Sequence, residues 1–305
     1  MTKIALIAFA GASNWPLFAG QKLGFFAEQG IDLTVALTPN SRHMARELHQ
    51  GQAQIALTSV DNVIAYGEGH GEEPLDGKVD FFAFMGVDDG LLSIMAQPGI
   101  RTIGDLKGRT LAVDAMTTGF AFVLREILTQ AGLRDEDVTY AMVGTGAERL
   151  AALKSGACDA TLLNAPLCLA AESSGHSRLV HAKDILGRYQ GIVGAAKRQW
   201  ADENAQALIA FIKAFHVSLS WLAGPENKVA AIEMLAERMP NLSKSLDLAY
   251  EVLITHGGLT QTLEIDHAGV AKVIELRRRY SAHAGKALKT ADAYIDDSYR
   301  VTELG

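Results

Sequence analysis

One order of strands and helices occurs twice in this chain, and it limits the possible folds more than any other feature. The first copy is predicted to hold three strands, at Ile4–Phe9, Asp32–Leu37 and Ile55–Thr58. The second copy repeats them at Arg109–Val113, Val138–Val143 and Ala160–Leu163. Each copy reads β-α-β-α-β, which indicates parallel strands joined by right-handed helical crossovers. Two copies therefore predict two similar α/β domains.

The two copies also align residue by residue. When Gly51 is placed opposite Gly156, HMARELHQGQAQIALTSVDN lies against ERLAALKSGACDATLLNAPL at nearly equal spacing. Ser59 then falls opposite Asn164, and Asp61 falls opposite Pro166. Equivalent loops are therefore expected at the ends of equivalent strands.

Two segments are expected to connect the domains. The apolar runs VDFFAFMGV and LLSIMAQ are separated by Asp88-Asp89-Gly90, and a second crossing is expected at residues 187–194. From Asp202 onward the apolar spacing is three to four residues, which predicts helices only. The expected fold is α/β with two lobes, each a mostly parallel sheet flanked by helices, and a ligand cleft between them. Lobe 1 is predicted to be residues 1–88 with 188–305, and lobe 2 the inserted residues 89–187.

Composition excludes several classes of function. The 305 residues carry a net charge of −7, which argues against nucleic acid as a partner. The basic run Arg277-Arg278-Arg279 is most simply a solvated helix face. No apolar run approaches the roughly 20 residues of a membrane span, so a soluble protein is expected. Cys158 and Cys168 have no metal-type spacing, and the nine histidines form no metal motif. We therefore expect no metal, no cofactor and no catalytic residue.

Candidate ligand-binding residues follow the predicted strands, because ligands of open α/β sheets bind at the carboxyl ends of the strands. The first copy and the crossing contribute Ser13, Asn14, Trp15, Arg42, Ser59, Asp61 and Asp88. The second copy contributes Asp114, Thr117, Thr118, Gly119 and Asn164. Hydroxyls, amides and helix N-terminal N–H groups suit a small polar or anionic molecule.

Structural alternatives stay open for several of these residues. Trp15 is either a stacking face for a planar ligand or a packing residue of the first helix. Asp61, Asp114 and the segment 116–119 are as readily helix caps as ligand contacts. Arg42 at a helix start either faces an anion or has no such role, and Asp88 either binds the ligand or orients the crossing.

Three segments carry a family resemblance. IGDLKGRTLAVDAMTTGFAF, PLFAGQKLGFFAEQGIDLTV and ARELHQGQAQIALTSVDNV resemble solute-binding proteins of ABC importers. The branch includes binders of nitrate, alkanesulfonates, taurine and thiamine-pyrimidine precursors. The resemblance implies a periplasmic-binding-protein fold of the second structural type, with the ligand clamped by hinge closure. The cysteine-rich motif of the related thiamine-pyrimidine synthases is missing, so an enzyme of that type is not expected.

The resulting hypothesis is the substrate-binding subunit of an ABC importer. Its expected partners are a small-molecule ligand and the permease and ATPase subunits, and it is expected to be a monomer. The alternative is a cytoplasmic enzyme or ligand sensor of pyrimidine or cofactor metabolism on the same fold. The expected location is periplasmic, or extracellular and membrane-associated, if a leader was removed, and cytoplasmic if Met1 is the native start.

Overall fold

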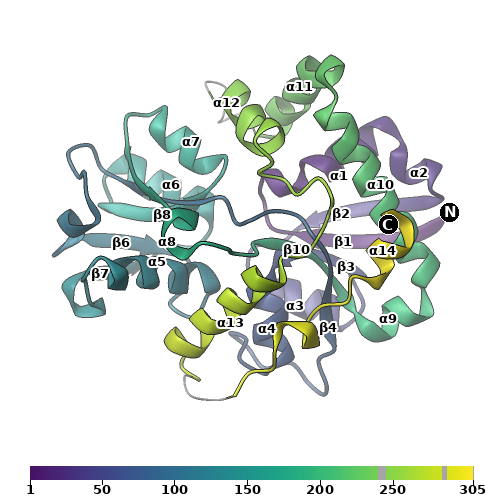
Figure 1. Ribbon diagram of the computed structural model, residues 1–305, viewed down its shortest axis with the longest axis horizontal. Helices are drawn as coiled ribbons and strands as arrows, with labels where there is room; N and C mark the ends of the chain where they lie inside the picture. Colours follow the sequence, from purple (N-terminus) through teal and green to yellow (C-terminus); the bar gives the residue numbers. More distant parts are fainter. Residues whose placement is uncertain (240–244, 284–286, 305) are drawn as a thin grey trace.

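The computed structural model describes residues 1–239, 245–283 and 287–304, and it contains two five-stranded sheets (Figure 1). The first sheet holds β1 (Thr2–Ala8), β2 (Ile31–Leu37), β3 (Ile55–Ser59), β4 (Phe81–Gly86) and β10 (Ile192–Lys197). The second sheet holds β5 (Leu92–Ala96), β6 (Thr110–Val113), β7 (Thr139–Met142), β8 (Ala160–Asn164) and β9 (Ser177–His181). The two sheets and their helices form the two lobes that the sequence predicts.

The predicted repeat is present in the strand order of the sheets. The first sheet runs β2-β1-β3-β10-β4, and the second runs β7-β6-β8-β5-β9. In each sheet the three repeat strands are parallel, and the fourth strand is antiparallel to its neighbours. Each lobe therefore has a mostly parallel sheet. All strands of the second sheet lie within residues 89–187, which we keep as the proposed extent of lobe 2.

Helices cover the faces of both sheets. The first lobe has α1 (Trp15–Leu23), α2 (Phe25–Glu28), α3 (Ser41–His49) and α4 (Val60–Gly67). The second has α5 (Gly119–Gln130), α6 (Gly146–Ser155), α7 (Leu167–Glu172) and α8 (Ala182–Leu186). The chain then continues through α9 (Arg198–Glu203), α10 (Ala205–Ala223), α11 (Lys228–Arg238), α12 (Leu246–Tyr250), the π-helical turn η6 (Glu251–Thr255), α13 (His267–Tyr280) and α14 (Ser298–Leu304). Short 3-10 turns are η1 (Ala12–Asn14), η2 (Ile103–Leu106), η3 (Asp135–Asp137), η4 (Pro225–Asn227) and η7 (Ala291–Ala293).

The helix α10 corrects one expectation. It is long and apolar enough, by length and composition, to cross a membrane, whereas we expected no segment to approach that length. In the structure α10 packs against α1 and α14, and it buries Phe211, Phe215 and Leu219 completely. The same length and composition are found in a core helix of a folded domain, and α10 has that place here.

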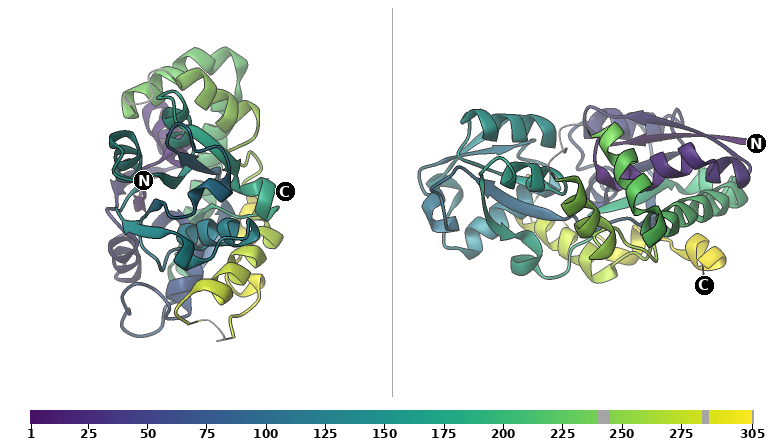
Figure 2. Two further views of the ribbon diagram at one scale, coloured as in Figure 1. Left: turned by 90° about the vertical axis from the view of Figure 1, so that its left-hand side faces the viewer. Right: turned by 90° about the horizontal axis from the view of Figure 1, so that it is seen from above.

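Helix α13 lies along the junction of the lobes. Although it follows the helices of the first lobe in sequence, it packs against both α4 of the first lobe and α5 of the second. Figure 1 shows it below the junction, and the right-hand view of Figure 2 shows the lobes side by side along the long axis. The C-terminal part of the chain therefore contributes to both lobes.

Candidate ligand-binding site

The two lobes meet through the loops that the sequence singled out. A Cβ atom added to Gly119 would lie 2.8 Å from Cβ of Asp61, so the start of α5 rests directly on the start of α4. A Cβ atom on Gly11 would lie 4.0 Å from Nδ2 of Asn164. Residues far apart in the chain thus lie together where the strands of both sheets end. Gly119 is required here by the close approach of the lobes, whatever its role toward a ligand.

Asp61 forms a buried ion pair with a residue that we misassigned. Arg277 Nε donates to Asp61 Oδ1 at 2.7 Å, and the two side chains are only 2% and 3% exposed. Arg277 Nη2 also reaches the carbonyl oxygen of Thr117 in the second lobe at 3.4 Å. The expectation that Arg277 belongs to a solvated face is therefore wrong. In this conformation the Asp61 carboxylate connects α4, α13 and the loop before α5.

Asp88 ties the two crossing segments together, as one of the two readings of the sequence predicts. We define the crossing segments as residues 87–91 and 187–192, the second of which ends at the first residue of β10. Asp88 Oδ1 accepts the N–H of Gly90 at 2.8 Å and that of Ile192 at 2.9 Å, and Oδ2 accepts the Ser13 hydroxyl. Burial raises the pKa of the Asp88 carboxyl, and these three hydrogen bonds lower it in part.

The hydroxyl groups at the helix starts have capping roles. Thr118 Oγ1 accepts the N–H of Ala121 at 3.3 Å and donates to Asp114 Oδ1 at 2.7 Å. Ser59 Oγ accepts the N–H of Asp61 at 3.3 Å. Thr118 corresponds to the capping alternative for the segment 116–119, whereas the cap of α4 is Ser59 and not Asp61. The Thr117 side chain, by contrast, is exposed and has no hydrogen bond among the described residues.

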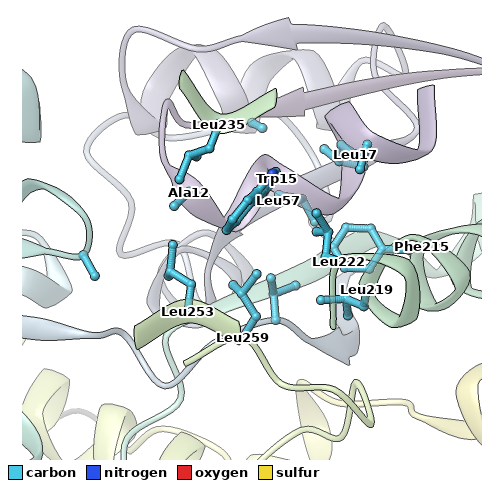
Figure 3. Packing of buried hydrophobic residues seen from close by; sticks show 14 of the residues in the cluster. Ala12, Trp15, Leu17, Leu57, Phe215, Leu219, Leu222, Leu235, Leu253 and Leu259 are labelled. Atoms are coloured by element: carbon cyan, nitrogen blue, oxygen red, sulfur yellow. The ribbon is translucent and has the colours of Figure 1, made fainter. Parts of the chain in front are cut away.

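Trp15 and Asn14 are buried next to the first strand. Trp15 is 1% exposed, and its ring meets the edge of the Tyr250 ring at a centroid distance of 6.1 Å. Figure 3 shows the ring among Ala12, Leu235 and Leu253. Asn14 Nδ2 donates to the carbonyl oxygen of Phe9 at 2.7 Å. In the structure Trp15 is therefore a packing residue of the first helix, and neither face of its ring is open to a ligand in this conformation.

Arg42 lies away from the junction. Its guanidinium is 3.6 Å from Glu72 and 3.5 Å from Glu73, and its side chain is 48% exposed. These carboxylates follow α4 and lie on the surface of the first lobe. The structure therefore does not bring Arg42 together with the other predicted residues.

Asn164 is a predicted residue whose side-chain amide lies at the junction of the lobes. It ends β8, and its amide has no side-chain hydrogen bond to the part of the chain that the structure describes. Besides the Nδ2 atom near Gly11, its Oδ1 atom lies 3.9 Å from the position of a Cβ on Gly146. The amide is therefore placed between the first lobe and the start of α6.

Arg149 was not predicted from the sequence. This side chain is 5% exposed, and its Nη2 atom lies 4.0 Å from the same Cβ position on Gly146. It donates to the carbonyl oxygens of Gly144 at 2.6 Å and Leu162 at 3.4 Å, and no carboxylate of the described residues forms an ion pair with it. Burial lowers the pKa of the guanidinium, although an arginine keeps its charge. A cation in the first turn of a helix opposes the helix dipole. This feature made Arg42 a candidate, and Arg149 near the start of α6 has it too.

Tyr189, in the second crossing segment, was also missed. It is 5% exposed, and its hydroxyl is buried without a hydrogen-bond partner among the described residues. Burial, with Asp61, Asp88 and Asp114 nearby, raises the pKa of the phenol above its usual value. Nothing in the local sequence distinguishes this tyrosine from an ordinary core residue. Among the described residues, no group of three His, Cys, Asp or Glu side chains is arranged to hold a metal ion.

Comparison with known proteins identifies the family of this chain. A family model described as NMT1/THI5 like matches residues 12–227. The chain belongs to this family. A comparison with curated protein sequences gives no match. The family assignment agrees with the resemblance seen in the sequence.

Solved structures of the same fold are similar over nearly the whole chain. A Bordetella bronchiseptica protein is 20% identical with a TM-score of 0.78, covering 99% of this chain and 97% of its own. The ligand-binding component of an ABC-type import system from Staphylococcus aureus, with zinc bound, is 13% identical with a TM-score of 0.76, covering 99% of each chain. The periplasmic aliphatic sulphonate-binding protein SsuA from Escherichia coli is 18% identical with a TM-score of 0.72, covering 98% and 99%. At these identities the likeness establishes the fold, which is that of periplasmic binding proteins.

Proposed function

We propose that this protein is the substrate-binding subunit of an ABC importer and holds a small polar or anionic organic molecule between its lobes. Its family and the import-system proteins with the same fold support this role. The observation that carries the proposal is the position of Asn164, whose amide has no side-chain partner among the described residues and lies between Gly11 and Gly146. Binding without chemical turnover is the activity we infer.

The chemistry beside Asn164 favours an anionic group. Arg149 is a buried cation that forms no ion pair in the described chain, although Asp114 and Glu148 are near enough to interact with its charge. The N-terminus of α6 adds the positive end of a helix dipole. A hydrogen bond to a charged group contributes about 1.5–3 kcal/mol. We therefore propose that a sulfonate, carboxylate or similar group lies near Asn164 and Arg149. We also propose three further contacts with the ligand, which form or break as the cleft closes or opens: Thr117, Ser13 and the backbone of Gly119.

Calorimetric titration of the purified chain tests the ligand class. We expect saturable binding for at least one member of a panel of nitrate, alkanesulfonates, taurine, short carboxylates and aminopyrimidines. Asn164→Ala should then weaken that binding about tenfold, which corresponds to about 1.4 kcal/mol. Asn62→Ala is a matched control, because the Asn62 side chain donates a hydrogen bond to the Thr58 hydroxyl within the first lobe. Unchanged affinity in Asn164→Ala would place the ligand elsewhere.

Transport needs a second experiment. A permease and an ATPase encoded beside this gene should take up the ligand into vesicles only when this protein is added on the periplasmic or extracellular side. Ligand-stimulated uptake would support the importer role and that location. Binding without any uptake, or conversion of the ligand by the protein alone, would favour the cytoplasmic enzyme or sensor.

A further inference from the structure

A separate cavity of about 80 Å³ lies where the two lobes and the crossing segments meet. Its walls include Leu91 and Tyr189 from the two crossing segments, Val252 from η6, and Leu92 and Leu169 from the second lobe. None of the twelve residues predicted from the sequence lines it. A water molecule needs roughly 10–15 Å³ by this measure, so the cavity has room for an organic molecule of roughly five non-hydrogen atoms. We name it the hinge cavity.

The backbone at one wall is strained. Leu91 has a φ of 45°, a left-handed conformation that is uncommon for a residue with a side chain. Its N–H donates to Asp89 Oδ1 at 3.1 Å, and its carbonyl oxygen accepts the N–H of Ala165 at 3.0 Å. These bonds hold the leucine side chain at the cavity wall. Backbone strain of this kind concentrates at binding and switch sites.

The polar wall of the hinge cavity carries no uncompensated charge. Arg178 forms an ion pair with Glu172, and its Nη1 atom lies 2.7 Å from His181 Nε2. Because a guanidinium can only donate, Nε2 must accept, and the ring proton is on Nδ1, 3.2 Å from Ser93 Oγ. His181 is therefore neutral. Burial, reinforced by the Arg178 cation, lowers the pKa of His181 and keeps it so at neutral pH.

The remaining charged residues at the hinge cavity are both exposed to solvent. Lys183 and Asp89 line it, and they have opposite charges. Neither forms an ion pair among the described residues, but both are hydrated at the surface, so an ion inside the cavity would gain only a solvent-screened counter-charge. The hydration that the ion loses costs several kcal/mol. An uncharged molecule has no such cost and gains contact with the leucine, valine and tyrosine side chains.

We propose that the hinge cavity binds a small, uncharged, mostly apolar organic molecule, at a site distinct from the anion-binding cleft proposed above. Such a molecule would contact both crossing segments and both lobes at once. The proposal does not depend on the importer role or on the ligand of the cleft.

Three probes of equal chain length test the proposal by ligand-observed NMR titration of the whole protein: butan-1-ol, butanoate and butylammonium. We expect saturable binding of butan-1-ol at least tenfold tighter than that of either ion. Butanoate or butylammonium binding as tightly as the alcohol would overturn the charge argument. No saturable binding of butan-1-ol would overturn the site itself.

Two variants that reduce the space locate the binding. Val252→Phe should weaken butan-1-ol binding at least tenfold, whereas Val229→Phe, the same change at a residue that is 71% exposed, should leave it unchanged. If Val252→Phe does not fold, Ala182→Val adds bulk from the second lobe. Asn164→Ala should have no effect. Binding that survives both filling changes, or that Asn164→Ala removes, would contradict the assignment to the hinge cavity.

Discussion

The role of Trp15 is decided by its surroundings. A tryptophan followed by proline at a helix start can offer a ring face or pack into the core, and the sequence is the same in both cases. Here the ring is 1% exposed and contacts Tyr250, which is 235 positions further along the chain (250 − 15). No local pattern predicts such a contact, so the sequence is compatible with both roles of Trp15.

Trp15→Ala should therefore destabilise the fold strongly. Loss of a fully buried tryptophan costs about 3–5 kcal/mol through lost burial and the cavity left behind. Urea unfolding measures this change, and Trp15→Phe should cost less because it keeps an aromatic ring. A Trp15→Ala variant as stable as the wild type would show that the ring is not part of the core in solution.

Asp88 should make stability depend on pH. Its pKa is raised in the folded protein, so the folded state holds this proton more tightly than the unfolded state does. The resulting stability is fully present below the unfolded pKa of about 4 and is lost as the pH rises through the folded pKa. Relative to Asp88→Asn, the wild type should therefore lose stability as the pH rises above about 4.

Unfolding in urea at several pH values compares the two proteins. The amide oxygen introduced by Asp88→Asn can still accept the N–H groups of Gly90 and Ile192, so the fold is retained. Asp89→Asn is the matched control, because Asp89 is exposed and adjacent. Parallel pH profiles for the wild type and Asp88→Asn would refute the assignment of this effect to Asp88.

At the scale of elements, helix α5 depends on its N-cap. Thr118→Ala removes the hydroxyl that accepts the N–H of Ala121, at a cost of about 1 kcal/mol. Thr117→Ala, one residue earlier and exposed, should change the free energy of unfolding by less than about 0.5 kcal/mol. Chemical denaturation of both variants is the measurement. Equal losses would mean that Thr118 does not act as the cap.

Elements with a clear period were predictable from the sequence, and two strands, β9 and β10, were not. The repeat predicted the strands β1–β3 and β6–β8, because apolar runs between glycine-terminated helices are local signals. The strand β10, Ile192–Lys197, was read as part of the crossing. Its sequence IVGAAK has small residues, and Gly194 is needed because a Cβ there would lie 2.8 Å from Met85 and Phe84. Small residues in a tightly packed central strand resemble a loop when only the sequence is known.

At the scale of the whole molecule, Arg277 connects both lobes, because it forms an ion pair with Asp61 and also donates to the carbonyl oxygen of Thr117 in the second lobe. Asp61 and Arg277 are 216 positions apart, so their pairing was not predictable, and a run of three arginines usually lies on the surface. For the same reason the sequence identified the loops that meet at the junction but not Arg149 or Tyr189, whose roles depend on what surrounds them in three dimensions.

Arg277→Met should destabilise the protein by about 3–5 kcal/mol, because it leaves the Asp61 carboxylate buried without a partner. The double change Asp61→Leu with Arg277→Met should recover much of that loss, since no buried charge remains. The exposed pair Lys22–Glu237 is the control, and Lys22→Ala should cost about 0–1 kcal/mol. Denaturant unfolding of all variants tests this, and a double variant less stable than Arg277→Met would argue against it.

The position of β10 between β3 and β4 has a consequence for biosynthesis. The apolar strand Phe81–Gly86 has no neighbour in its sheet until residue 197 has left the ribosome. A further 111 residues must be synthesised after Gly86 before that point is reached (197 − 86). An unpaired, fully buried strand is prone to aggregation while it waits. We therefore expect the nascent chain to be most prone to aggregation between the synthesis of β4 and that of β10.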